Sequence, residues 1–287
     1  MLKEAGMSII TISRGSYSHG KEVAEALAEK LRYDCLSREI MVETSDQFKI
    51  PEKKLLKALH DAPTAFEWFN HDQERLVHFF RSTFLSHMAQ GNIVYHGLAG
   101  HFFLQNITHV LKVRIIANMD DRVREETACE KCSASYALKK LKADDKERRK
   151  WSLHLYGKDP WDCRLYDMVL CVDSLTVDDA VDLLVQTVQK KQFQATEASL
   201  AELKQRLLYA NILAKVYQAS SSAKIRFINA SSIELSDTDG PLKTDKIARK
   251  NFSSKIKELY HIEDVLYKEP LHPFKGHINT FYNVNVQ

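Results

Sequence analysis

Gly15, Gly20 and Lys21 are the residues whose types and spacing could do chemistry. Two glycines separated by four residues and followed by a lysine fit the G-x4-G-K core of a phosphate-binding loop. Glycines allow backbone N–H groups to turn toward phosphate oxygens, and the lysine adds a mobile positive charge. Glu22 takes the place of the Ser or Thr that binds Mg²⁺ in this motif. The pattern favours phosphate binding, and the alternative is an ordinary strand-to-helix turn.

A strand before the loop and a helix after it would position these residues. Residues 9–12 read IITI, a β-branched run that is typical of a buried strand. Val23, Leu27 and Leu31 follow at helical spacing, so we expect a helix to begin near Gly20. The N-terminus of that helix would add positive potential beside the loop.

The chain up to residue 190 alternates between strands and helices. The expected strands are 93–96, 111–117 and 166–172, and the expected helices are 72–90, 121–155 and 177–190. Residues 33–40 read as a connection into a second helix, and Pro51 stands where another helix could begin. This alternation indicates a parallel sheet that is covered on both faces. The aromatic residues at helical spacing are expected in the core, and these are Trp68, Phe69, Phe79, Phe80 and Phe84.

The composition indicates a soluble protein. The 287 residues are 44% hydrophobic and 28% charged, and the net charge of +3 is too small to argue for binding to nucleic acid. No apolar run approaches the ~20 residues that span a bilayer, and the start MLKEAGM does not resemble a signal peptide. Five cysteines are an odd and sparse set, which favours reduced thiols and a cytoplasmic protein. Cys129 and Cys132 form one CxxC pair without the second pair of a zinc site, so no metal site is expected.

The chain changes character near residue 192, where we expect a domain boundary. A helix to about residue 218, strands over 224–229 and 233–236, a helix over 243–260 and a strand over 262–267 follow. This α-β-β-α-β order is weakly similar to BON-type modules, which are small domains associated with ligand or membrane-surface binding. The alternative is a structural appendage that packs on the first domain or dimerises it.

Four segments in the first 190 residues together resemble the cytidylate-kinase-like family of nucleoside monophosphate kinases. These are ITISRGSYSHGKEVAEALAEKL, YDCLSREIM, NIVYHGLAG and DDKERRKWSLHLYGKDPWDCRLYDMVLCVDS. The resemblance implies a P-loop kinase fold with a five-stranded parallel sheet and a helical, arginine-bearing lid. It also implies phosphoryl transfer from ATP, with Mg²⁺, to a pyrimidine nucleoside monophosphate such as CMP or dCMP.

The same resemblance implies roles for individual residues. Lys21 would contact the donor phosphates, Arg38 the acceptor phosphate, and Arg148 and Arg149 would act from the lid, where Asp145 and Arg148 match the family's D-x-x-R pair. Arginine suits these roles because its planar guanidinium binds phosphate oxygens in pairs. The residues expected to hold the nucleotide are Gly15, Ser16, Ser18, His19, Gly20, Lys21 and Glu22.

Departures from the family pattern leave a second hypothesis open. Leu98 stands where the family has the arginine of a GRG motif, and Tyr17 and His19 occupy loop positions that the family fills with small residues. Ser16 or Ser18 would then have to supply the hydroxyl for Mg²⁺. The alternative is a nucleotide-binding regulatory protein with little or no catalysis. A third hypothesis is a binder of nucleic acid or membrane surfaces that acts through the slightly basic residues 192–287.

Overall fold

The computed structural model describes residues 7–60, 71–97 and 99–268, and these fall into two compact units that divide between Lys215 and Val216. The sequence analysis placed the boundary near 192, and the difference lies in α9 (Glu197–Ala219). Residues of α9 before the division bond to the first unit. Arg206 donates to the carbonyl oxygens of Phe103 and Gln105, and Ser82 donates to the Asn211 side chain.

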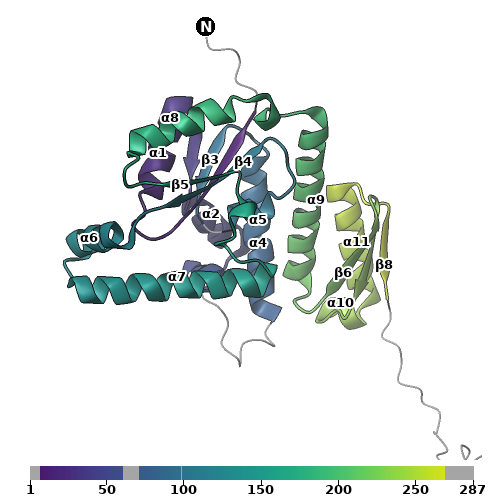
Figure 1. Ribbon diagram of the computed structural model, residues 1–287. Coiled ribbons are helices and arrows are strands. Elements are labelled where there is room, and N and C mark those ends of the chain that lie inside the picture. The colour runs from purple at the N-terminus through teal and green to yellow at the C-terminus, as the bar shows by residue number, and fades with distance from the viewer. Residues whose placement is uncertain (1–6, 61–70, 98, 269–287) are drawn as a thin grey trace, which may run out of the picture. The chain divides into compact units, whose positions relative to one another are not determined.

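A five-stranded parallel sheet forms the centre of the first unit (Figure 1). Its strands are β1 (Ile9–Arg14), β2 (Asp34–Leu36), β3 (Ile93–His96), β4 (Val110–Ile116) and β5 (Met168–Cys171). The order across the sheet is β2-β3-β1-β4-β5, and every neighbouring pair is parallel. The fold expected from the sequence is therefore confirmed. β2 falls inside the segment that the sequence analysis read as a connection, because three residues are too few to show a strand periodicity.

Helices cover both faces of this sheet. The helices of this unit up to α8 are α1 (Gly20–Leu31), α2 (Glu39–Phe48), α3 (Glu52–His60), α4 (His71–Met88), α5 (Gly100–Phe103), α6 (Met119–Glu130), α7 (Ala134–Tyr156) and α8 (Val177–Val188). Ile10 and Ile12 of β1 pack with α1 and α8 on one face, whereas Ile9 packs with α4, α5 and α7 on the other. Phe79, Phe80 and Phe84 are buried in this core, as expected, and Trp68 and Phe69 lie outside the described residues.

The prediction of a single helix over 121–155 is wrong, because this segment forms two helices, α6 and α7, with a break between them. Lys131 adopts a left-handed conformation with φ of 51° and ends α6. Ser133 then starts α7, and its hydroxyl accepts a hydrogen bond from the backbone N–H of Tyr136. The break allows α6 and α7 to pack against each other at the carboxyl end of the sheet.

The second unit takes in only the last residues of α9, so of the expected α-β-β-α-β order it holds the β-β-α-β part. β6 (Lys224–Asn229) pairs antiparallel with β7 (Ser232–Ser236), which pairs parallel with β8 (Asp264–Tyr267). The expected helix over 243–260 is two helices, α10 (Pro241–Thr244) and α11 (Lys246–Tyr260). Asp245 separates them because its carboxylate accepts from the first N–H groups of α11. Of the helices formed by the described residues, none combines the length and apolar character that crossing a bilayer requires.

Candidate active site

The loop between β1 and α1 leads directly into a helix N-terminus that has no side-chain cap. Tyr17 and His19 adopt left-handed conformations, with φ of 55° and 61°, and His19 is the N-cap of α1. The His19 side chain makes no capping hydrogen bond, so the first N–H groups of α1 are left for another acceptor. An uncapped helix N-terminus directly after a tight loop is suited to an anion.

Close packing explains both glycines of the loop. A Cβ on Gly20 would lie 2.6 Å from the Cβ of Arg14, an atom next to the backbone that cannot move away. A Cβ on Gly15 would lie 3.1 Å from Nη2 of Arg122. Neither glycine has a positive φ angle, so the loop needs glycine here for space rather than for backbone conformation.

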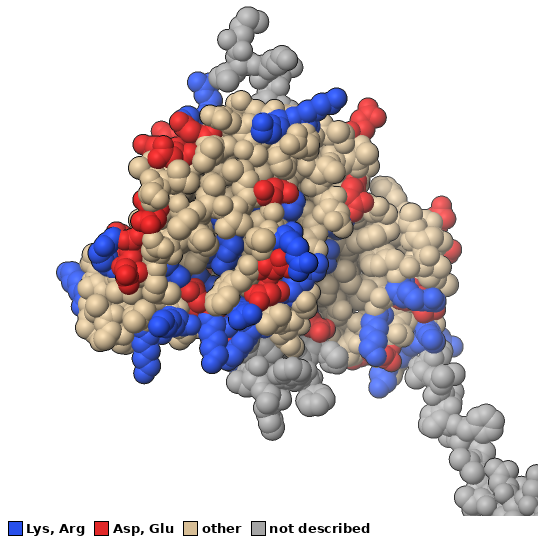
Figure 2. Space-filling view, viewed as in Figure 1, with Lys and Arg blue, Asp and Glu red and all other residues tan. Residues whose placement is uncertain are grey.

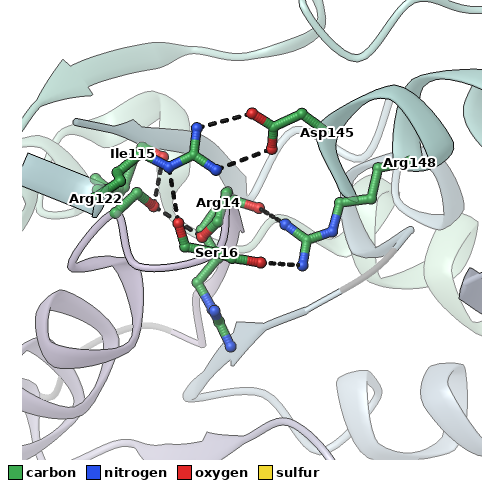
Figure 3. Close-up of polar contacts among 8 residues, drawn as sticks. Arg14, Ser16, Ile115, Arg122, Asp145 and Arg148 are labelled. Carbon is green, nitrogen blue, oxygen red and sulfur yellow. Dashed lines mark hydrogen bonds and ion pairs between the residues drawn. The ribbon is translucent and has the colours of Figure 1, made fainter. Parts of the chain in front are cut away.

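Two arginines from α6 and α7 converge on Ser16 in this loop (Figure 3). Arg122 donates from Nε to the Ser16 carbonyl oxygen at 2.8 Å and from both terminal nitrogens to Asp145, at 2.8 and 3.0 Å. Arg148 donates to the Ser16 hydroxyl at 2.8 Å and lies 3.5 Å from the Arg14 carbonyl oxygen. Burial of the Arg148 guanidinium lowers the pKa of this group. The predicted pair Asp145 and Arg148 thus lies at the loop.

Ser18 has a different place from Ser16. Its side chain is buried, and its hydroxyl lies 3.0 Å from the Gly15 carbonyl oxygen and 3.3 Å from that of Ile115. The hydroxyl therefore joins the loop to β4 and is engaged by backbone. The Tyr17 hydroxyl donates to Glu130 at 2.9 Å, and burial followed by this contact raises the pKa of Tyr17 to about 12. Tyr17 is directed toward α6.

The other predicted residues lie outside this cluster. Lys21 is 60% exposed and its Nζ is 3.6 Å from Glu25, while Glu22 is exposed with its carboxylate 3.9 Å from His19. Arg38 is 75% exposed and pairs with Glu52. Arg149, the other arginine expected to act from a lid, pairs with Asp159, and its guanidinium lies 4.6 Å from the centre of the Trp161 ring. Leu98 is outside the described residues.

A small cavity of about 50 Å³ opens beside the loop, where β1, β3 and β4 end. Its lining includes Ser13, Arg14, Arg114, Asp145, Arg148 and Trp151. Arg114 of β4 donates toward the hydroxyls of Ser13 and Tyr166, at 3.3 and 3.4 Å. Ligands of open parallel sheets bind at this edge, where neighbouring connections leave in opposite directions.

Sequence reasoning missed Arg14, Arg114 and Arg122. Arg14 stands in the SRG of the opening segment, and Arg114 is a charged residue inside the apolar strand LKVRIIA, which was a usable signal. Arg122 is one of several charges in DDRVREE, and nothing in that run distinguishes it. Figure 2 shows further basic side chains over the region of α7, whose sequence carries seven Lys and Arg residues between 139 and 150.

Comparisons with known proteins agree with this architecture. Residues 9–174, more than half of the chain, match the model of the cytidylate kinase-like family. An uncharacterised protein from Eubacterium ventriosum ATCC 27560 is similar in structure, with a TM-score of 0.51, 20% identity and coverage of 64% of this chain and 99% of that chain. Among curated proteins no match reaches significance.

Two kinases are also similar, at lower scores. Shikimate kinase from Bacteroides thetaiotaomicron has a TM-score of 0.40 and 13% identity, over 64% of this chain and 99% of its own. A gluconokinase from Sinorhizobium meliloti 1021 has a TM-score of 0.35 and 14% identity, over 72% of this chain and 98% of its own.

Proposed function

This chain belongs to the cytidylate kinase-like family, and on that premise we propose that it transfers a phosphoryl group from ATP to a pyrimidine nucleoside monophosphate. The observation that supports this most is the convergence of Arg122 and Arg148 on Ser16 of the loop. Phosphoryl transfer needs little covalent help from a protein. It needs two substrates held in line and cations around the group in transit.

The loop suits the phosphates of the donor. The first N–H groups of α1 have no side-chain cap, so they are available to a phosphate oxygen at the end of the loop. Lys21, which follows directly, would leave its exposed contact with Glu25 to reach a bound phosphate. Such a rearrangement costs little because surface ion pairs are worth only about 0–1 kcal/mol.

Most of the ligands of a bound Mg²⁺ would come from the nucleotide rather than from the protein. The described residues contain no group of three or more His, Cys, Asp or Glu side chains placed to hold a metal. Phosphate oxygens would therefore supply most ligands, as is common for Mg²⁺. Ser16 is the better placed hydroxyl in the loop, because that of Ser18 is engaged by backbone. Bound Mg²⁺ would neutralise charge on the phosphates.

The lid residues would act on the group in transit. Arg148 already contacts the loop, so its guanidinium would lie next to phosphates bound there. Asp145 holds the Arg122 guanidinium in a fixed plane through two hydrogen bonds. Arg149 pairs with Asp159 and would contribute only after that pair opens.

A regulatory, weakly catalytic protein is the second candidate. It is favoured by the exposure of Lys21 and by Glu22 at the position of the Mg²⁺-binding hydroxyl. Both candidates predict that ATP raises the melting temperature, since a ligand that binds only the folded state must stabilise it. Only the kinase predicts ADP release that depends on the acceptor.

ADP release should be measured with CMP, dCMP, UMP and AMP for the wild type, Lys21→Ala and Lys30→Ala. Lys30 is the matched control because it lies on the same helix, is exposed and pairs with Asp182. We expect Lys21→Ala to lower kcat/KM about a hundredfold, as loss of a charge at the transition state does, and Lys30→Ala to leave it unchanged. Equal rates for the wild type and Lys21→Ala would refute the kinase, and ATP binding without acceptor-dependent ADP release would favour the regulatory candidate.

A further inference from the structure

We propose that Arg114 binds the anionic group of the acceptor substrate and thereby sets the specificity for acceptors that carry a phosphate. This inference rests on the proposed function and assigns one of its substrate contacts. The reasoning starts from an excess of positive charge in the cavity beside the loop.

The position of Arg114 suits this role. It is paired in register with Ser13 on β1, immediately before the loop, and lines the same cavity as Arg148. Residues Gly97 and Ala99, which follow β3, line the cavity from the other side. A group bound here would lie between the ends of β1, β3 and β4, next to the loop that would hold the donor.

The cavity lining is rich in cations and poor in anions. Three arginines line it, Arg14, Arg114 and Arg148, against one acid, Asp145. Both carboxylate oxygens of Asp145 already accept from Arg122, which itself adds a further positive charge. Arginine stays protonated in proteins, so the charges cannot be lost by titration. Charges removed from water without a counterion are costly, and a bound anion relieves that cost.

Arg114 contacts neutral groups only, among the residues that the structure describes. Its partners are the hydroxyls of Ser13 and Tyr166, and its guanidinium lies 5.7 Å over the Tyr166 ring. Lys112, two residues earlier on the same face of β4, has an acid partner in Asp167 at 2.9 Å. Among the described residues, Lys112 therefore has an acidic partner, whereas Arg114, which lines the cavity, does not.

The size of the cavity identifies what part of the substrate it holds. About 50 Å³ is far below the roughly 300–1,000 Å³ of pockets that enclose a whole drug-sized ligand. The cavity therefore suits one oxyanion group and not a nucleotide. The phosphate of a nucleoside monophosphate has this size and charge, and it is also the group that would attack the donor.

The test compares CMP with cytidine, which lacks the phosphate, by calorimetry on the full-length protein with a non-hydrolysable ATP analogue present. We expect Arg114→Gln to weaken CMP binding about tenfold or more, the loss of one charged hydrogen-bond pair, and to leave cytidine and the ATP analogue within twofold. Arg114→Lys keeps the charge and should lose less. Arg124→Gln is the matched control, because Arg124 is an exposed arginine that pairs with Asp121.

Retained binding of the ATP analogue shows that each variant is folded. If CMP binds Arg114→Gln as it binds the wild type, or if the wild type does not distinguish CMP from cytidine, the inference is overturned. Turnover separates the two proposals. Wild-type turnover of CMP with an unchanged CMP KM in Arg114→Gln overturns the role of Arg114 alone. Binding of CMP that depends on Arg114 in a protein without turnover supports Arg114 and refutes phosphoryl transfer.

Discussion

Replacing Asp145 by Asn is expected to loosen the loop and destabilise the first unit. The side chains of Arg122 and Asp145 are only 9% and 19% exposed, so the pair is poorly screened by water. Removal of one partner from a buried ion pair costs about 3–5 kcal/mol, because the other charge is left without compensation. Arg122 would keep its bond to the Ser16 carbonyl oxygen, and Asn would keep one acceptor oxygen. We therefore expect a loss of about 2 kcal/mol, below that range.

Urea unfolding followed by tryptophan fluorescence measures this loss. The three tryptophans, Trp68, Trp151 and Trp161, all belong to the first unit, so the signal reports on that unit. With a slope of about 3 kcal/mol per molar urea, the midpoint should fall by about 0.7 M. The affinity for ATP should fall as well, since Arg122 positions the loop.

Asp144→Asn is the matched control. It removes the same charge from the adjacent residue, which makes no hydrogen bond or ion pair with the described residues and acts on Arg148 only by a longer-range electrostatic attraction. A loss in Asp145→Asn no greater than in Asp144→Asn would refute the view that the paired hydrogen bonds to Arg122 hold the loop.

Two further predictions concern stability. Burial, followed by the charge of Arg14 or Arg114, lowers the pKa of His96 to about 4 and of His101 to about 3. Below pH 6.5 these histidines take up protons in the unfolded chain but not in the folded chain. The free energy of unfolding is therefore highest above pH 6.5, and it falls by about 1.4 kcal/mol per pH unit for each histidine as the pH drops toward 4. Urea unfolding midpoints at pH 7.5 and 5.5 measure this loss of stability. If the midpoint of His101→Gln changes with pH as much as that of the wild type, the role of His101 is contradicted. Ser133→Ala removes the N-cap of α7 and should cost about 1 kcal/mol, whereas an unchanged midpoint would show that the cap is dispensable.

More of the fold than of the candidate site could be predicted from the sequence. Strands β1, β3 and β4 are continuous apolar runs, and α1 has apolar residues at helical spacing, so a parallel sheet covered by helices could be predicted from these segments. The break between α6 and α7 was not, because it depends on a left-handed Lys131, a residue type with no preference for that conformation.

Some residues of the candidate site could be predicted from the sequence, and others could not. Gly15 and Gly20 were recognisable because the backbone spacing of the loop is local in sequence. Arg122 reaches Ser16 across 106 positions, and a separation of that kind leaves no trace in a single sequence. Lys21 was identified from the loop motif and Arg38 from the family resemblance, and the structure places both at exposed positions where each pairs with a glutamate.

The contact between Gly15 and Arg122 makes substitutions at distant positions of the chain depend on one another. A side chain in place of Gly15 would press on the Arg122 guanidinium, and loss of the Asp145 carboxylate would leave that guanidinium without its ion-pair partner. A shorter residue in place of Arg122 would leave both Ser16 and Asp145 without their hydrogen-bond donor. Single steps at any of these positions pass through a damaged intermediate. Lineages that descend from this chain are therefore expected to exchange these residues together or to keep them all.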